Sequence, residues 1–155
     1  MKILIGINSR ERLNDLLSKL DPTMAPLWGK MKPQQMIEHL IEEVEYTNGK
    51  KMADCRRPDE DATRDKKTFV YSDFKIPKNV ILGTLPDKYR YGSLEISIKQ
   101  LMKELEDFDE YFSQQGATSV HFNFGAMDHS EWLTWHSKHF THHLVQFGLL
   151  PPELS

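Results

Sequence analysis

Residues 93–112 read SLEISIKQLMKELEDFDEYF, and this stretch decides the fold. Its apolar side chains recur every three or four residues over about five helical turns, at Leu94, Ile98, Leu101, Leu105, Phe108 and Phe112. That spacing places them on one face of an α-helix, and such a face must be buried against other elements. Ser93 can cap the start of the helix, and the pair Gln115-Gly116 can end it. We therefore predict a long amphipathic helix here.

Three more segments have the same kind of pattern, over about residues 9–20, 33–48 and 128–147. Pro33 fits the first turn of the second of these helices, where its missing N–H costs nothing. Asp128 and Glu131 have the spacing of a capping box at the start of the last one. Four amphipathic helices without a clear strand pattern predict an all-α, four-helix bundle. The length of the chain suits one domain over residues 1–155.

The segments between these helices are harder to interpret. Residues 50–91 carry little apolar periodicity, so we expect a long crossover with little regular structure and a short β-like run at residues 68–71. A loop of this length in a compact domain is usually functional or partly mobile. Residues 116–128 are expected to be a plain connection. The apolar run Ile3–Ile7 is expected to be a small strand or a packed arm.

The overall composition argues against several classes of protein. The formal net charge is −3, and the basic residues are spread out or lie beside acidic ones, so we expect no nucleic-acid partner. No window has the roughly 18 consecutive apolar residues of a membrane span, so we expect no membrane association. Cys55 is the single cysteine, cannot form an internal disulfide, and favours a reducing cytoplasm.

Histidines gather near the end of the sequence. Four of the seven lie in the run HSKHFTHH on the last predicted helix. His139 and His143 are one turn apart, so their imidazoles point the same way and can converge on one metal ion. A third ligand must come from another helix, and His39 is the candidate because it is the only histidine in the first three predicted helices. The pattern predicts a three-histidine metal site.

A simpler interpretation stays open beside this one. A single histidine pair at this spacing is a weak signal, and histidine clusters also occur on wet helix faces. Against that, His139 and His143 share a face with Trp132, which should point to the core. Two buried imidazoles need partners, because an unpaired buried polar group costs about 1–3 kcal/mol, and a shared metal satisfies both. We place His136 and His142 on the polar face or in a supporting position behind the ligands.

Acid–base candidates come mainly from the second predicted helix. Glu43 lies one turn after His39 and is the predicted catalytic group, with Glu42 beside it. Glutamates on helices are usually only solvated charges, and that alternative stays open. Gln146 is close in direction to His139, where it can orient a ligand or a histidine, or simply pack at the edge of the bundle.

Two motifs resemble the DinB/YfiT-like superfamily of metal-dependent enzymes, in a poorly characterised branch. One motif is LWGKMKPQQMIEHL at residues 27–40. The other is Glu131-Trp132 followed by KHFTHHLVQFG at residues 138–148. The spacing of the predicted helices also fits, so the resemblance covers most of the chain and is loosest at about residues 50–90.

The resemblance implies a four-helix bundle with an up-down-down-up arrangement and a long crossover between the second and third helices. It implies a metal triad of one histidine on the second helix and a pair on the fourth, which map onto His39, His139 and His143. Characterised relatives use a divalent ion, nickel or zinc among others. Some transfer low-molecular-weight thiols, some isomerise thiol adducts, and many have no known reaction, so family membership does not fix the chemistry.

An open position on the ion leads to the expected function. Three imidazoles leave room for water or a thiol, which is typical of a catalytic rather than a structural site. The leading hypothesis is a metal-dependent enzyme, a thiol transferase or hydrolase that acts on a small molecule. The alternatives are a non-catalytic metal-binding or stress-response protein, and a helical interaction module without metal. Bundles of this kind often pair through helix faces, so a homodimer is one expected assembly.

Overall fold

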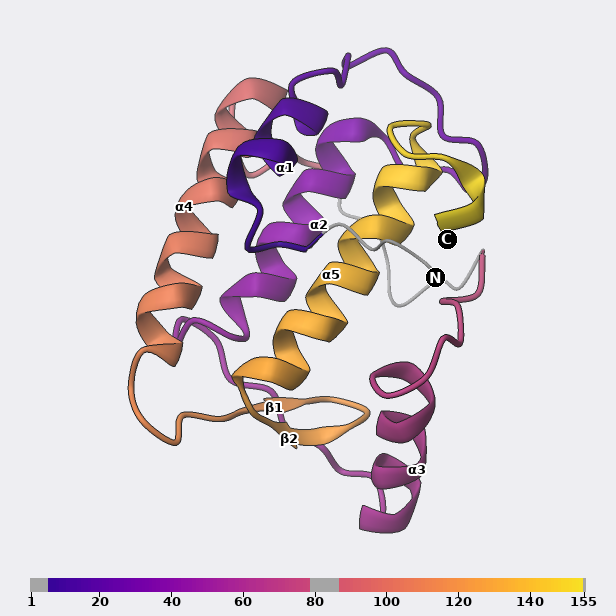
Figure 1. Cartoon of the computed structure of the whole chain (residues 1–155). Coiled ribbons are helices and arrows are strands. Elements are labelled where there is room, and N and C mark those ends of the chain that lie inside the picture. Colours follow the sequence, from indigo (N-terminus) through magenta and orange to yellow (C-terminus); the bar gives the residue numbers. More distant parts are fainter. Residues whose placement is uncertain (1–5, 79–86, 155) are drawn as a thin grey trace.

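The protein is mostly helical (Figure 1). The computed structural model describes residues 6–78 and 87–154, so most of the run Ile3–Ile7 and part of the crossover lie outside the described residues. In the described ranges there are five α-helices: α1 (Arg10–Leu17), α2 (Pro33–Glu45), α3 (Asp59–Phe69), α4 (Leu94–Phe112) and α5 (His129–Gln146). A hairpin of two strands, β1 (Ser119–His121) and β2 (Gly125–Met127), lies between α4 and α5, and a short 3-10 helix, η1 (Pro152–Leu154), follows α5.

Helices α2, α4 and α5 lie side by side, and α1 packs on α4 (Figure 1). The apolar face predicted for α4 is confirmed, because Leu101, Leu105 and Phe108 are fully buried. The same core contains side chains from α2 and α5, among them Ile37, Ile41, Phe140 and Leu144. The four predicted helices are all present. None of the helices in the described ranges is long and apolar enough to cross a bilayer.

Local signals in the sequence set where three of these helices begin. Pro33 is the first residue of α2, and the Ser93 side chain accepts a hydrogen bond from the backbone N–H of Ile96 at the start of α4. At the start of α5 the capping box is confirmed, because Asp128 accepts from the N–H of Glu131 at 2.9 Å and Glu131 accepts from the N–H of Asp128 at 3.1 Å. These signals account for where α2, α4 and α5 begin along the sequence.

Helix α3 lies where the sequence predicted little regular structure. The run at residues 68–71, expected to be β-like, falls at the end of this helix. Only Ala62 of α3 is buried, so the helix has no apolar stripe that periodicity could reveal. Charges suited to the helix dipole occupy its first and last turns, at Asp59, Glu60, Asp61, Lys66 and Lys67. Helix α3 packs beside the hairpin, away from α2 and α4 (Figure 1).

The hairpin corrects the prediction of a plain connection at residues 116–128. Strands β1 and β2 pair antiparallel, with Ser119 opposite Met127. Gly125 has a φ of +76°, a left-handed conformation that favours glycine at the turn. The indole N–H of Trp132 donates a hydrogen bond of 3.0 Å to the carbonyl of Ser119, which ties the hairpin to the start of α5. Over residues 6–78 and 87–154 the architecture is therefore helices with one small hairpin rather than helices alone.

Candidate metal centre

Three histidines from two helices meet at one point of the structure. Nε2 of His139 on α5 lies 3.2 Å from Nε2 of His39 on α2 and 3.0 Å from Nε2 of His143. The nitrogens that the three side chains offer all lie within 4.8 Å of one another. His139 and His143 are buried, whereas His39 is half-buried. The structure thus brings together the three residues predicted as metal ligands.

A hydrogen-bonded network fixes the orientation of α2 around His39. The buried carboxylate of Glu38 accepts hydrogen bonds from the backbone N–H groups of Arg90 and Tyr91, at 2.7 and 3.2 Å. The guanidinium of Arg90 donates to Glu45 through both terminal nitrogens, at 2.7 and 3.2 Å. Because Glu38 and Glu45 lie about two turns apart on α2, these bonds hold the rotation of the helix, and with it the direction of His39.

The tautomer of His143 follows from its neighbour Gln146. The amide nitrogen of Gln146 donates to the carbonyl of Trp28 at 3.1 Å, so its amide oxygen faces His143. Nδ1 of His143 therefore carries the proton and donates it to that oxygen, at 2.7 Å. A neutral ring with its proton on Nδ1 presents a lone pair at Nε2, and that lone pair points toward His139.

Protons alone do not satisfy this junction of three nitrogens. If Nε2 of His139 carries a proton, the one hydrogen must be shared between two acceptors, His39 and His143. If that proton is instead on His39, the lone pairs of His139 and His143 face each other at 3.0 Å. Nδ1 of His139 is buried without a hydrogen-bond partner in the described part of the chain, and this holds whether or not Nε2 binds a cation. A cation between the rings satisfies all three lone pairs at once.

The protein environment keeps these imidazoles neutral, as metal ligands must be. Burial lowers the pKa of His143 to about 3, with a smaller contribution from the nearby His39. Burial also lowers the pKa of His139 well below its ordinary value, and His143 and His39 add to that effect. The pKa of His39 is lowered by burial as well, although Glu42 acts in the opposite direction. The group therefore offers lone pairs rather than charges.

The donor set suits a zinc-like ion. Tetrahedral zinc with imidazoles at about 2.0–2.1 Å has ligand nitrogens ~3.3 Å apart, close to the 3.0 and 3.2 Å between these nitrogens. Imidazole also suits nickel, copper and iron, whereas calcium and magnesium take oxygen ligands. No carboxylate joins the group among the described residues. The residues present thus fit a divalent transition metal with at least one coordination position left for another ligand.

Glu43, the predicted catalytic group, lies outside the histidine group but has a shifted pKa. It is half-buried on α2, one turn after His39. Burial raises its pKa to about 7, and repulsion from the neighbouring Glu42 adds to the shift while Lys51 opposes it. A carboxyl group with a pKa near neutrality can both accept and donate a proton under physiological conditions.

Neither of the other two histidines in the run at residues 136–143 lies on a polar face. His136, expected on the polar face or behind the ligands, is fully buried in the core. Its Nε2 donates to Thr47 Oγ1 at 3.0 Å, because that hydroxyl already donates to a backbone carbonyl. His142 is also buried, and its ring centroid lies 5.3 Å from the rings of both His143 and Trp28. His142 therefore lies beside the ligand group, which is the other position expected for it, whereas His136 lies in the core.

The fold and the histidine group together define a helical protein with a candidate three-histidine metal centre. The sequence profile of a family described as "Protein of unknown function (DUF1569)" matches residues 63–148, which is more than half of the chain. The chain therefore belongs to this family. The matched range contains His139 and His143 but not His39. No curated protein and no solved structure matches the chain.

Proposed function

We propose that the protein is a metal-dependent enzyme that acts on a small molecule, with one divalent ion held by His39, His139 and His143. The proposal rests on the Nε2 atom of His139, which lies 3.0 Å from Nε2 of His143 and 3.2 Å from Nε2 of His39. Protons alone leave this junction unsatisfied. Zinc or nickel suits an all-imidazole set of ligands. When bound, such an ion supplies a Lewis acid that lowers the pKa of water or of a thiol.

Other residues of the chain would transfer protons and orient the ligands. Glu43 takes up or releases a proton at neutral pH, since its pKa lies near 7. Gln146 holds the ring of His143 so that Nε2 faces the other two histidines. His39 is the half-buried member of the group, whereas His139 and His143 are buried.

The reaction classes that fit are transfer of a thiol and hydrolysis, because both begin with a nucleophile whose pKa must be lowered. The second candidate function is that of a non-catalytic metal-binding or stress-response protein, in which the ion stabilises the junction of α2 and α5. The burial of His139 and His143 favours this candidate, because a deeply buried ion is less accessible to a substrate.

The proposal extends to membership of the DinB/YfiT-like superfamily. Its support is that α1, α2, α4 and α5 contribute to one core, and that the histidines come from the second and the last of these helices. In that arrangement the four helices run up-down-down-up, and α3 lies within the long crossover. A homodimer formed through helix faces, and a cytoplasmic location in which Cys55 stays reduced, belong to the same proposal.

Metal analysis of the untagged protein tests the site. We expect an equimolar amount of zinc or nickel in the wild-type protein and loss of most of it in His39→Ala, His139→Ala and His143→Ala. His129→Ala is the matched control, because His129 is exposed at the start of α5 and stacks on Phe112 instead. Wild-type metal content in the first three variants would show that the proposed site is wrong.

An activity screen separates the enzyme from the non-catalytic alternative. The metal-loaded protein is offered low-molecular-weight thiols together with electrophiles, and then simple esters and amides. A rate above that of free metal, reduced in Glu43→Gln at unchanged metal content, supports the enzyme. No acceleration above free metal across the screen favours the non-catalytic metal protein.

A further inference from the structure

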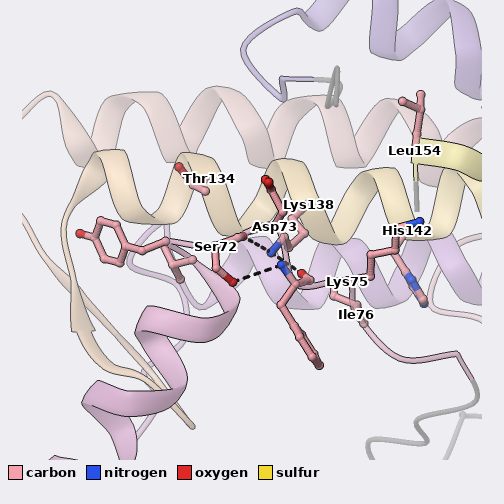
Figure 2. A pocket seen from close by; sticks show the side chains of 11 residues that line it. Ser72, Asp73, Lys75, Ile76, Thr134, Lys138, His142 and Leu154 are labelled. Atoms are coloured by element: carbon pink, nitrogen blue, oxygen red, sulfur yellow. Dashed lines mark hydrogen bonds between the residues drawn. The ribbon is translucent and has the colours of Figure 1, made fainter. Parts of the chain in front are cut away.

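A cavity of about 420 Å³ lies beside α5. Figure 2 shows its two walls, formed by residues 70–76 on one side and by Thr134, Lys138 and His142 of α5 on the other. Leu154 of η1 lies at the end of the cavity near His142 (Figure 2). The volume falls in the range of about 300–1,000 Å³ that is typical of pockets for small organic ligands.

Lys138 fastens the outer wall of this cavity to α5. Its Nζ donates hydrogen bonds to the backbone carbonyls of Phe69, Ser72 and Phe74, at 2.8, 3.1 and 2.6 Å. An ammonium group has three protons, so each carbonyl can receive one. The segment is therefore held in place before any ligand arrives, and a pre-formed cavity reduces the entropy lost on binding.

Much of the cavity lining is apolar, and two of its aromatic side chains are exposed to solvent. Val70, Ile76 and Leu154 provide aliphatic surface. Tyr71 and Phe74 also line the cavity and are 67% and 47% exposed. Large apolar side chains left in contact with water around a concave site are typical of surfaces that bind a ligand. The cavity thus favours a ligand with an apolar body.

Two of the three charged residues that line the cavity are positive. Lys75 and Lys138 line it, against one acidic residue, Asp73. Just beyond the lining, Nζ of Lys78 lies 4.7 Å from the centroid of the Trp28 ring, and that ring contacts His142. The side chain of Lys75 is exposed to solvent. On a chain whose net charge is −3, this local excess of lysine favours a negatively charged ligand.

His142 connects the cavity with the candidate metal centre. Its side chain lines the cavity, and its ring centroid is 5.3 Å from that of His143. A ligand that contacts His142 from within the cavity therefore lies one side chain away from a proposed metal ligand. This adjacency distinguishes the cavity from an unrelated surface hollow.

We propose that the cavity binds the substrate of this protein and that the substrate is a small organic anion, an apolar and preferably aromatic body with a carboxylate or sulfonate group. Residues 70–76 and α5 enclose the body, and Lys75 attracts the anionic group. The inference rests on the proposed function in its link to the metal, whereas binding of the anion itself depends only on the cavity.

A fluorescence titration with 8-anilinonaphthalene-1-sulfonate tests the binding, with neutral N-phenyl-1-naphthylamine as the matched uncharged probe. We expect the sulfonate to bind the folded protein more tightly than the amine. Thr134→Phe fills the cavity and should weaken binding at least about tenfold, the effect of losing ~1.4 kcal/mol. Lys75→Gln should weaken it about threefold. Lys19→Gln removes the same charge from an exposed position outside the cavity lining and should leave binding unchanged.

Circular dichroism establishes that each variant is folded, and Lys75→Gln at an exposed position provides a second test if Thr134→Phe does not fold. Equal binding of the two probes, or binding that neither substitution weakens, overturns the inference. In the cobalt-loaded protein we expect the sulfonate to shift the visible absorption bands, and unchanged bands overturn the link between cavity and metal. Failure of the wild-type protein to bind metal overturns the proposed function instead, and the fluorescence titration still reports on the cavity.

Discussion

Nδ1 of His143 lies 2.7 Å from Oε1 of Gln146 and donates a hydrogen bond to it. Gln146 is itself held from two sides, because its amide nitrogen donates to the carbonyl of Trp28 and its backbone carbonyl accepts from the N–H of Leu27 at 2.7 Å. The segment that leads into α2 therefore controls the ring of a histidine on α5. This couples the two helices that supply the candidate ligands through more than the ligands themselves.

Replacing Gln146 should weaken metal binding without removing a ligand. Groups that orient a metal-bound histidine typically contribute about 10- to 100-fold in affinity, so we expect a loss of that size in Gln146→Ala. In Gln146→Glu an oxygen can still accept from Nδ1 of His143, and most of the affinity should remain. Competition with a chromophoric chelator measures the affinities. Gln115→Ala, at an exposed position after α4, is the control, and equal affinity in Gln146→Ala and Gln115→Ala would contradict the orienting role.

Glu43 should make the stability of the metal-free protein fall as the pH rises. Its pKa is raised by burial from an ordinary value of 4.5 to about 7. Between these two values the folded protein holds a proton that the unfolded chain has released, so the free energy of unfolding decreases with pH across this window and levels off above it. Glu43→Gln stays neutral and should avoid that decrease.

The expected difference between Glu43→Gln and wild type is near zero at pH 4.5 and on the order of 2 kcal/mol in favour of the variant at pH 8, a value reduced for partial solvation of the carboxyl group. Urea unfolding in the presence of a chelator, repeated from pH 4.5 to 8, measures it. Glu106→Gln, at an exposed position on α4, should follow the wild-type profile. A pH-independent difference would mean that Glu43 titrates at its ordinary pKa.

His139→Leu should be more stable than the wild type without metal and less stable than the wild type with metal. Nδ1 of His139 is buried without a hydrogen-bond partner among the described residues, and such an atom costs about 1–3 kcal/mol. With a chelator present, the leucine variant should therefore be more stable than the wild type by about 1 kcal/mol. With zinc at 100 times its Kd the wild type should gain about 2.7 kcal/mol and the variant nothing.

Calorimetry measures the Tm of both proteins, once with chelator and once with zinc. The wild-type gain in zinc corresponds to a rise in Tm of about 5–10 °C for a chain of this size. If His139→Leu is less stable than the wild type in chelator, the three imidazoles stabilise one another without a metal, and the main argument for the site fails.

The sequence predicts those elements in which burial of one face makes apolar residues recur at a regular spacing. The apolar face of α4 is such a case, since Leu101, Leu105 and Phe108 are all fully buried. Helix α3 is the opposite case: with only Ala62 buried, nothing in the pattern distinguishes it from a polar loop. The strands of the hairpin are three residues long, too short for an alternating pattern to stand out.

The candidate site also has a part that the sequence predicts and a part that depends on the folded structure. His139 and His143 share a direction because of helix geometry, so their pairing follows from spacing alone. The position of His39 depends on how α2 is rotated, and that rotation is held by Glu38 and by residues of a distant segment. The cavity was not predictable, because its outer wall is attached through Lys138 to carbonyls more than sixty residues earlier in the chain.

Lys138→Met should loosen that wall while leaving the metal centre intact. The substitution removes all three hydrogen bonds to the carbonyls of Phe69, Ser72 and Phe74 but keeps an apolar stem of similar length. Hydrogen bonds to a charged group contribute about 1.5–3 kcal/mol each when buried, and partial exposure of this group reduces the expected loss in the free energy of unfolding to about 2 kcal/mol in total. We expect the larger effect to be local.

Hydrogen exchange followed by mass spectrometry measures this local effect in peptides that cover residues 69–76. Their amides should exchange faster in Lys138→Met than in the wild type, because the segment opens without the rest of the fold. Lys67→Met is the matched control, because it removes the same charge from an exposed position on α3. Unchanged exchange in this segment would mean that the loop holds its shape without Lys138. Unchanged metal content alongside faster exchange would show that the wall and the histidine group are independent structural units joined only by α5.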